Sequence, residues 1–507
     1  MEKNLKHIAI IGGGIMGISS ALYLIRRGCK VTIIEKEPNG EPASYGNASW
    51  LSSSSITPVL MPGAIFKIPK MLFSRDGPLF LKFPQTLKIM PWLIKYLTYS
   101  SEEKVNYISK HLTPLLANSI DEHKKLAQGT DAIQWIKESP FLYIYKNKTD
   151  YIKDSFTWNI RKKHGFKILE IEKDELDELV PGLSKEYTFA IKIDKQGYIS
   201  DSKNYLNDLI EGYKKLGGKI IQDKVIDILS DEKKINIKTE KSEILVDGVV
   251  IAAGVYSDKL SKKFGANVPL QSERGYHLEL SDTNVKLNFP LMNGYLKLAI
   301  APKPSGIRFA GLVEFGSLKS SPNKKAYDLL LRNALSMFPD IIYGNKKEWS
   351  GHRPATIDSL PLIGQSSKDE KVFFAYGHHH IGLTAGPKTG ELISKAVFRD
   401  NDQMDLSPYK IKKYFVSDVV EPIKNHVKAK RYLARNQKYY QILSEASKTS
   451  LSLQGGVMDN LETKEFEKEH FFDNSIKLRE FDEGAKKNGL KIKSIDEYKD
   501  LLISKLS

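Results

Sequence analysis

Three glycines near the N-terminus, Gly12, Gly14 and Gly17, have the types and spacing to do chemistry, in the pattern G-x-G-x-x-G. This spacing supports a tight turn, close approach of the backbone to a pyrophosphate and tight packing of a helix on a strand. A pyrophosphate there would meet the free N–H groups and the dipole of the helix N-terminus. Glu35, about 18 residues later, could accept hydrogen bonds from ribose hydroxyls and would repel a 2′-phosphate. The residues of this segment that we expect to contact a dinucleotide are Gly12, Gly14, Ile15, Met16, Gly17, Glu35 and Lys36.

A strand before this turn, a helix after it and a second strand are needed to position it. Residues 7–12 read as a buried strand, residues 15–27 carry apolar residues at helical spacing, and residues 31–35 form a second strand. The α/β pattern returns with a helix through residues 205–216 and a strand at 248–254. Residues 269–315 alternate in polarity, which predicts an antiparallel sheet. Residues 49–100 look irregular with short helices.

Length and composition limit the classes of protein. A chain of 507 residues predicts two or three domains. A single cysteine, Cys29, excludes an intramolecular disulfide framework and a thiolate zinc cluster, and favours a reducing cytoplasm. The net charge of +16 is spread along the chain without a compact basic run, so we expect no nucleic-acid binding. The uncharged stretch 8–25 resembles a signal peptide, but its glycine spacing favours the strand–turn–helix.

Several further segments carry a family resemblance. They are VVIAAGVYSDKL (residues 249–260), FFAYGHHHIGLTAGPKTGELI (373–393), ASYGNAS (43–49), QGYISDS (196–202), ERGYHLEL (273–280), GIRFAGLVEF (306–315) and GHRPATIDSLPLIG (351–364). Together with the glycine turn they resemble the D-amino-acid dehydrogenase, glycine oxidase and sarcosine oxidase family over about residues 6–415. The resemblance implies FAD as the cofactor, because a chain that contacts its dinucleotide at both ends is typical of FAD proteins.

The resemblance also implies the fold and the cofactor contacts. We expect an α/β, Rossmann-like FAD-binding domain of the glutathione-reductase type, formed by about residues 1–50, 196–260 and 350–400. An interleaved antiparallel-sheet substrate domain would comprise about 51–195 and 265–345. The further FAD contacts that the resemblance implies are Ser44, Asn47, Ala48, Val225, Ala253, Gly254, Gly382, Leu383 and Thr384.

The implied reaction transfers a hydride from the α-carbon of a small amine or amino acid to the flavin, and the imine then hydrolyses. A carboxylate on the substrate needs a fixed cation, preferably a guanidinium. Arg353 matches the family arginine for this role; its alternative is a structural pair with Asp358. Arg274 is a second candidate, with a surface pair to Glu273 as the alternative. Tyr276, His277 and Tyr295 are candidates to line the pocket, or are strand residues that face a sheet neighbour.

Three consecutive histidines, His378, His379 and His380, suggest a metal site at first sight. Consecutive residues on a turn do not converge easily on one ion, and no acids cluster near them in the sequence, so we predict no metal. Relatives usually have glycine between two histidines, so His379 departs from the family pattern. The resemblance implies that a side chain at this position alters the local approach of the backbone to the flavin.

The electron acceptor stays open at this point, since dehydrogenases of the family use a membrane quinone and oxidases use oxygen. Residues 56–73 and 91–97 mix apolar, aromatic and lysine residues, a composition that could dock at a membrane interface. The alternative is an insert of the substrate domain with ordinary core packing. We therefore expect a cytoplasmic enzyme of amino acid catabolism, with peripheral membrane contact as an option.

The C-terminal residues 417–507 are charged, helical and strand-poor. Residues 421–458 and 474–487 resemble the second half of an HD-domain di-iron oxygenase that acts on aminophosphonates, with His426 and Asp482 at two ligand positions. The first half of that fold is missing and no His-Asp dipeptide occurs in the chain, so we expect no oxygenase activity. The remaining options are a docking domain for a partner, a half-site completed by a partner, or a remnant of gene fusion.

Three functions compete at this stage. The leading one is an FAD-dependent amine or D-amino-acid dehydrogenase. The second is an oxidase that produces hydrogen peroxide. The third is a flavin-binding scaffold whose C-terminal helices recruit a partner.

Overall fold

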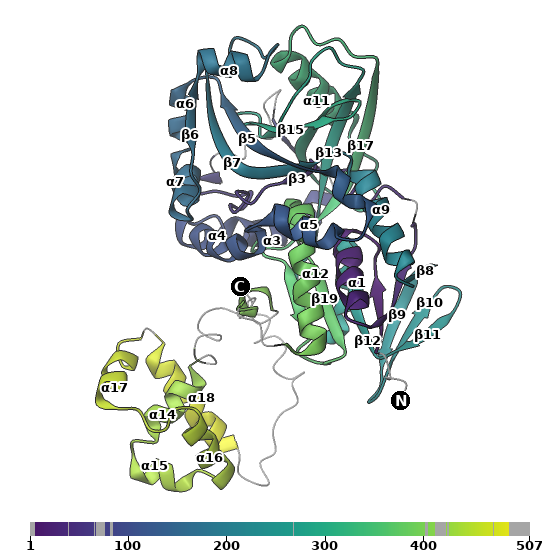
Figure 1. The fold of residues 1–507 in the computed structure, drawn as a ribbon. Helices are drawn as coiled ribbons and strands as arrows, with labels where there is room; N and C mark the ends of the chain where they lie inside the picture. Colours follow the sequence, from purple (N-terminus) through teal and green to yellow (C-terminus); the bar gives the residue numbers. More distant parts are fainter. Residues whose placement is uncertain are drawn as a thin grey trace. The chain divides into compact units, whose positions relative to one another are not determined.

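The computed structural model describes residues 6–38, 40–64, 66, 77–81, 85–266, 268–400, 404–410, 422, 425–469 and 471–485 (Figure 1). For residues 85, 86, 446 and 482–485 it describes only the backbone. The chain divides into two compact units, Met1–Ile411 and Lys412–Ser507. Each unit is described by itself below.

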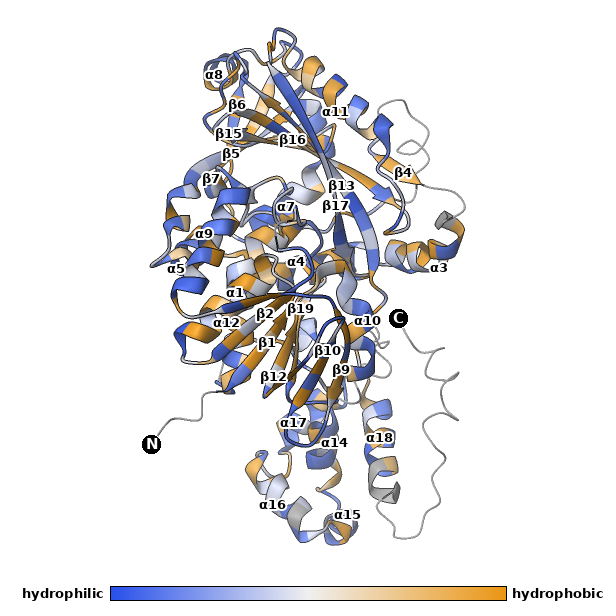
Figure 2. Ribbon diagram, turned by 90° about the vertical axis from the view of Figure 1, so that its right-hand side faces the viewer, coloured by the Kyte–Doolittle hydropathy of each residue, from blue (hydrophilic) through white to orange (hydrophobic). Residues whose placement is uncertain are grey.

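A six-stranded sheet lies under the glycine turn in the first unit. Its order is β18-β19-β12-β1-β2-β8, and all neighbours are parallel except β18 and β19. The strands are hydrophobic along most of their length (Figure 2), as expected for strands covered on both faces. Their bounds are β1 (His7–Ile11), β2 (Lys30–Glu35), β8 (Lys219–Gln222), β12 (Gly248–Ile251), β18 (Leu362–Gln365) and β19 (Val372–Tyr376).

Helices α1 (Ile15–Arg26) and α12 (Gly382–Phe398) pack closely against each other beside this sheet (Figure 1). Two glycines of α12 permit the approach. A Cβ atom at Gly386 would lie 2.6 Å from Cγ1 of Ile15, and one at Gly390 would lie 2.6 Å from the carbonyl carbon of Ser19. The first and last elements of the unit therefore meet beside the glycine turn.

A ten-stranded, mainly antiparallel sheet forms the second layer. Its main path runs β17-β13-β16-β15-β14-β5-β7-β3, with β4 on β16 and β6 on β7. The strands are β3 (Trp50–Leu51), β4 (Leu79–Leu81), β5 (Ile136–Tyr145), β6 (Leu169–Glu172), β7 (Phe189–Ile199), β13 (Gln271–Ser281), β14 (Leu291–Asn293), β15 (Leu298–Lys303), β16 (Gly306–Phe315) and β17 (Asn345–Ala355). Strands β13, β15 and β16 are the alternating segments of the sequence. The expected α/β fold with an antiparallel second sheet is confirmed.

Helices surround both sheets, and a small antiparallel sheet of β9 (Val225–Ser230), β10 (Ile235–Thr239) and β11 (Glu243–Val246) adds to the first layer. The helices are α3 (Gln85–Thr98), α4 (Glu102–Leu116), α5 (Ser119–Ala127), α6 (Lys148–Lys153), α7 (Ser155–Lys163), α8 (Lys173–Leu179), α9 (Ser202–Lys215), α10 (Ser257–Ser261) and α11 (Lys324–Met337). Helix α9 begins earlier than the sequence predicted, because the Asp201 side chain accepts from the N–H groups of Lys203 and Asn204.

The second unit is helical where the structure describes it, as expected. Its helices are α14 (His426–Leu433), α15 (Gln437–Ile442), α16 (Glu445–Leu453), α17 (Asn460–Phe466) and α18 (Phe472–Ala485). Its buried apolar clusters are small; one consists of Ala429, Met458 and Phe466. None of the helices described in either unit is long and apolar enough to cross a bilayer.

Candidate functional site

A cavity of about 1940 Å³ lies between the carboxyl ends of the parallel strands and the face of β13, β16 and β17. Ligands of α/β sheets bind at this edge of the strands. Typical ligand pockets measure about 300–1,000 Å³, so this cavity has room for an extended dinucleotide together with a small substrate. All the cofactor contacts expected from the sequence line it, except Gly17.

The glycine turn has the geometry that its sequence predicts. Gly12 has a φ of 106°, and a Cβ atom there would lie 2.5 Å from the carbonyl oxygen of Ala252 at the end of β12. A Cβ atom at Gly17 would overlap the carbonyl oxygen of Gly12, so this glycine allows the helix to pack on the turn without facing the cavity. Side chains at these two positions would disrupt the turn that α1 begins from.

The expected ribose ligand, Glu35, also stabilises the turn. Its Oε2 accepts from the N–H of Gly13 at 2.7 Å, and its Oε1 accepts from the N–H of Glu37 at 3.1 Å. Ser44 Oγ accepts from the N–H of Ile15 at 2.9 Å, and therefore occupies one donor of the helix N-terminus. The carboxylate and the hydroxyl line the cavity, but each already has a protein partner.

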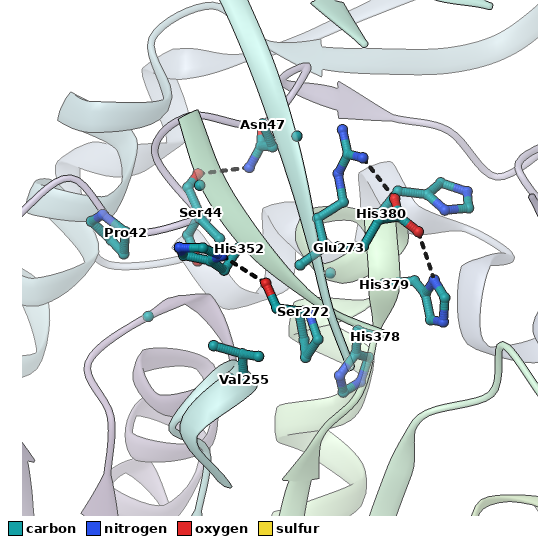
Figure 3. A pocket seen from close by; sticks show the side chains of 18 of the residues that line it. Pro42, Ser44, Asn47, Val255, Ser272, Glu273, His352, His378, His379 and His380 are labelled. Carbon is teal, nitrogen blue, oxygen red and sulfur yellow. Dashed lines mark hydrogen bonds and ion pairs between the residues drawn. The ribbon is translucent and has the colours of Figure 1, made fainter. Parts of the chain in front are cut away.

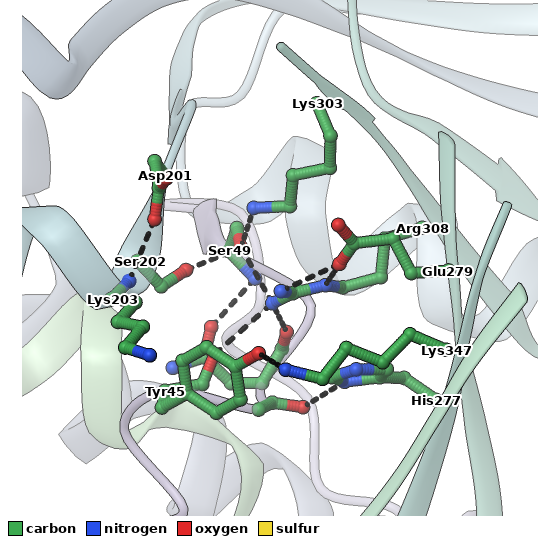
Figure 4. A network of polar contacts seen from close by, with 12 residues as sticks. Tyr45, Ser49, Asp201, Ser202, Lys203, His277, Glu279, Lys303, Arg308 and Lys347 are labelled. Carbon is green, nitrogen blue, oxygen red and sulfur yellow. Dashed lines mark hydrogen bonds and ion pairs between the residues drawn. The ribbon is translucent and has the colours of Figure 1, made fainter. Parts of the chain in front are cut away.

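The segment 43–48 lines the cavity and is held from behind by polar residues that the sequence analysis missed (Figure 4). Arg308 donates to the carbonyl oxygens of Tyr45 and Asn47 at 3.1 and 3.0 Å, and pairs with Glu279 at 2.9 Å. Lys303 donates to Ser49 Oγ, and burial together with Arg308 holds the pKa of its ammonium well below the usual range. The only sequence signal was one cation on each of two neighbouring, mostly apolar strands.

The N-terminus of α12 opens on the same cavity through Gly382, Leu383 and Thr384. Its N-cap residue, Ile381, provides no side-chain hydrogen bond to the first turn. Thr384 Oγ1 donates to the carbonyl oxygen of Trp50 at 3.1 Å, which fixes this turn to β3. The residues around the cavity therefore offer a pyrophosphate-type turn at one helix N-terminus and free backbone donors at another, a donor set that fits FAD.

Arg353 lies in the cavity wall, half-buried, on β17. Its Nη1 donates to Glu273 Oε1 at 2.7 Å and to the carbonyl oxygen of Leu312 at 3.2 Å. Among the described residues, Nη2 and Nε have no hydrogen-bond acceptor. The guanidinium lies over Gly275, where a Cβ atom would overlap it.

Glu273 is 1 % exposed and contacts both Arg353 and His379, whose Nδ1 lies 3.8 Å from Glu273 Oε2 (Figure 3). Burial raises the pKa of this carboxyl, but the charges of Arg353 and His379 outweigh burial and bring the pKa below its usual value. Neither structural pair considered for the arginines is present. Arg353 pairs with Glu273 and not with Asp358, and Arg274 pairs with Glu314 at 2.9 Å.

The other residues expected to bind the substrate do not all lie in the cavity wall. Tyr276 lines the cavity, but its hydroxyl donates to Glu314 Oε2 at 2.8 Å. Arg274 and His277 do not line the cavity; both are buried, and His277 stacks on Trp349 with ring centroids 5.1 Å apart. Tyr295 is 59 % exposed and also lies off the cavity. For His277 the sheet-facing alternative describes the position better, because Trp349 of the neighbouring strand β17 covers its ring. Arg274 is buried beside Glu314, so the surface pair considered for it is absent.

The three histidines point in different directions. His378 Nε2 contacts Thr389 Oγ1 at 3.0 Å, and His379 Nε2 donates to the carbonyl oxygen of Thr356 at 3.0 Å. His380 is exposed to the cavity, and desolvation by the protein around it lowers its pKa to about 4. His379 has a φ of 46°, the left-handed conformation that glycine adopts most easily, which explains why its position favours glycine. Its ring is buried and stacks on Tyr96, with ring centroids 6.0 Å apart, and the residue forms part of the cavity wall.

No group of three His, Cys, Asp or Glu side chains in the part of the chain that the structure describes could hold a metal ion. In the second unit, Arg479 Nη1 donates to His426 Nε2 at 2.8 Å and occupies the nitrogen lone pair that a metal would need. The side chain of Asp482, the other expected ligand, lies outside the described residues.

Comparison with known proteins agrees with this geometry. Residues 7–396 match the protein family described as FAD dependent oxidoreductase. A D-amino-acid oxidase of Bradyrhizobium diazoefficiens is 34% identical over 80% of this chain and 98% of its own length. A D-amino acid dehydrogenase of Helicobacter pylori is 25% identical over 77% of this chain and 94% of its own.

The fold is also that of a solved structure, the glycine oxidase from Geobacillus kaustophilus. The TM-score is 0.59 at 21% identity, over 80% of this chain and 98% of that one. The resemblance to an HD-domain oxygenase has no counterpart among these findings. The match over most of the first unit, together with a cavity whose donors fit the cofactor, shows that the chain belongs to the family of FAD-dependent oxidoreductases.

Proposed function

We propose that the protein removes a hydride from the α-carbon of a small D-amino acid and gives an imine that hydrolyses to the keto acid. The observation that carries the proposal is the guanidinium of Arg353 in the cavity wall. One of its nitrogens is held by Glu273 and Leu312, and the Nη2–Nε edge has no acceptor among the described residues. A carboxylate can accept two parallel hydrogen bonds from such an edge. The two relatives named for D-amino acids support the configuration.

The chain's own residues would bind and orient the substrate. Arg353 would fix the carboxylate, and thereby the direction of the Cα–H bond, which supplies part of the rate by restricting the reacting geometry. Glu273 neutralises part of the arginine's charge, so an anion binds by geometry as much as by charge. Bound FAD supplies the acceptor for the hydride. The residues that would hold FAD are those of the glycine turn, Glu35, segment 43–48 and the first turn of α12.

The test uses the purified full-length protein without oxygen. D- and L-amino acids, glycine, N-methylglycine and aminophosphonates are added in turn, and bleaching of the flavin absorbance is recorded. We expect bleaching by a D-amino acid with wild-type protein, and a large loss of substrate affinity with Arg353→Ala while FAD stays bound. Unchanged reduction of Arg353→Ala would remove the arginine from the proposal. A flavin-loaded protein that no amine bleaches would favour the scaffold function.

An extension of the same experiment identifies the electron acceptor. The relative with 34% identity is named an oxidase, which supports oxygen, whereas the relative with 25% identity is named a dehydrogenase. Admission of oxygen or of a soluble quinone to the reduced protein, with measurement of reoxidation rate and hydrogen peroxide, distinguishes the two. Fast reoxidation by oxygen with stoichiometric peroxide identifies an oxidase.

We further propose a peripheral membrane contact through helix α3. Leu87, Met90 and Ile94 are 63%, 39% and 58% exposed, and their spacing puts them on one helix face beside Lys88. An apolar face with flanking cations suits an anionic membrane surface. Co-sedimentation with anionic vesicles tests the contact, and Ile94→Asp should reduce it. Equal sedimentation of both proteins would remove α3 from the contact.

For the second unit we propose a protein–protein contact and no oxygenase chemistry. Leu453 and Leu461 are 85% and 68% exposed on a unit whose described buried clusters are small, and His426 already accepts from Arg479. A second copy of this chain is the first partner to test. Sedimentation velocity of the wild type and of Leu453→Asp over a range of concentrations should show weaker self-association in the variant.

A further inference from the structure

Helix α12 contains a proline in its second turn, Pro387. Proline has no N–H group, so residue 387 cannot donate to the carbonyl oxygen of Leu383 four residues earlier. Leu383 is only 6% exposed. A buried carbonyl without a donor is costly, so this oxygen needs a partner from another element.

His123 of helix α5 is that partner. Its Nε2 lies 2.9 Å from the carbonyl oxygen of Leu383, and its ring is fully buried. Because a carbonyl oxygen only accepts, Nε2 carries the proton, and Nδ1 accepts from the hydroxyl of Tyr205 on α9 at 2.6 Å. The chain of bonds Tyr205–His123–Leu383 therefore joins α9, α5 and the first turn of α12.

This first turn is the part of α12 that faces the cofactor site. Gly382, Leu383 and Thr384 line the cavity, and the N-cap residue gives no side-chain hydrogen bond to the turn. Two side-chain contacts therefore hold the turn and the direction of its free N–H groups: that of Thr384 with the Trp50 carbonyl and that of His123 with the Leu383 carbonyl. His123 lies outside the cavity lining and reaches the turn only through the Leu383 carbonyl.

We propose that His123 is a positioning residue for the bound flavin: it replaces the helical hydrogen bond that Pro387 removes and so aims the N-terminal turn of α12 at the cofactor. The proposal rests on the membership of the FAD-dependent oxidoreductase family and on no particular substrate. It assigns a role to a histidine that is 259 residues before Gly382 in the sequence and belongs to no motif of the glycine turn.

The arrangement allows a rescue experiment. His123→Leu removes the donor to Leu383, and Pro387→Ala restores an N–H group that can donate to the same oxygen from within the helix. The double variant therefore has the carbonyl satisfied without the histidine. Tyr205→Phe, which removes only the donor to Nδ1, is a milder perturbation. Tyr187→Phe is a matched control, because Tyr187 is equally buried, its hydroxyl accepts from Asn293 at 2.8 Å and it does not line the cavity.

Three quantities are measured on each full-length protein: the FAD dissociation constant of the apoprotein, the midpoint potential of the bound flavin and the Tm. We expect His123→Leu to raise the dissociation constant about tenfold, the scale of one lost hydrogen bond to a buried group, and to make the potential more negative. Pro387→Ala should return both values toward the wild type in the double variant. Tyr187→Phe should lower the Tm and leave both flavin quantities unchanged.

Two results would overturn the proposal. One is a His123→Leu variant with wild-type FAD affinity and potential, which would leave the histidine a purely structural role. The other is a double variant that stays as impaired as His123→Leu, because the carbonyl would then not be what the histidine acts through. Should His123→Leu fail to fold, Tyr205→Phe against Tyr187→Phe decides: equal flavin properties in the two would contradict the proposal.

Discussion

Replacement of Gly275 by alanine is the sharpest perturbation of the proposed carboxylate site. The guanidinium of Arg353 lies over this glycine, and a Cβ atom would lie 2.8 Å from its Nε and closer still to Cζ and Nη2. Neither strand backbone can yield easily, because β13 and β17 are paired along their whole length. The arginine side chain must therefore leave its position and give up its bonds to Glu273 and Leu312.

The size of the effect follows from what the guanidinium would lose. Hydrogen bonds to charged groups contribute about 1.5–3 kcal/mol, and loss of the fork to the substrate carboxylate should raise the substrate dissociation constant roughly 10- to 150-fold. The displaced charge also leaves the buried Glu273 without its arginine partner, so the Tm should fall. FAD retention should not change, since Gly275 faces the arginine and not the glycine turn.

Anaerobic stopped-flow reduction of the flavin separates substrate affinity from the limiting reduction rate. Gly311→Ala on the neighbouring strand β16 is the matched control, because the three atoms nearest to its Cβ position, at 3.2, 3.3 and 3.7 Å, belong to Lys297 and Leu298 and not to Arg353. An amine that lacks the carboxylate should bind both variants equally. An unchanged dissociation constant for the amino acid in Gly275→Ala would refute the assignment of Arg353.

Three further predictions concern the cofactor and the pH dependence. Gly12→Val should yield protein without flavin, seen in its absorbance spectrum, because its Cβ atom would lie 2.5 Å from the Ala252 carbonyl oxygen and φ is 106°. The folded pKa of the Glu273 carboxyl lies below its ordinary value, so the wild type should lose folding stability as pH falls below about 4.5. Glu273→Gln should lack this contribution at neutral pH and so lose less stability on acidification. Acid unfolding curves of both proteins test this. Burial lowers the pKa of His123 to about 4 from 6.5, so the wild type should lose up to roughly 3 kcal/mol of folding stability as pH falls from 6.5 toward 4, because the unfolded histidine then takes up a proton that the folded one does not. The difference in denaturant midpoint between wild type and His123→Gln, followed from pH 7 to pH 4.5, should shrink accordingly.

The glycine turn and the acid that follows it could be predicted from the sequence, because they are local, whereas the more distant FAD contacts rested on the family resemblance and stay predictions. The turn at residues 12–17 and the acid at Glu35 belong to one strand–helix–strand unit, in which spacing along the chain determines position in space. The α/β class, the antiparallel second sheet and the helical C-terminal region followed from periodicity in the same way. The departure at His379 was also visible in the sequence, and its φ of 46° supplies the backbone reason.

Only the tertiary structure determined which substrate candidates reach the cavity and which side chains hold its wall in place. Arg353 and Glu273 are 80 residues apart and meet only because β13 and β17 pair in that register, whereas Arg274, one residue further along β13, bonds to Glu314 and lies off the cavity. A one-residue step in a strand reverses the face of the sheet, and no pattern of residue types within one segment reveals which face meets the cavity. The same holds for His123 and Leu383, whose bond depends on a proline in one helix and the packing of another. The sequence determined which elements form and where the dinucleotide turn lies; the pairing of distant strands and helices decided which side chains reach the site.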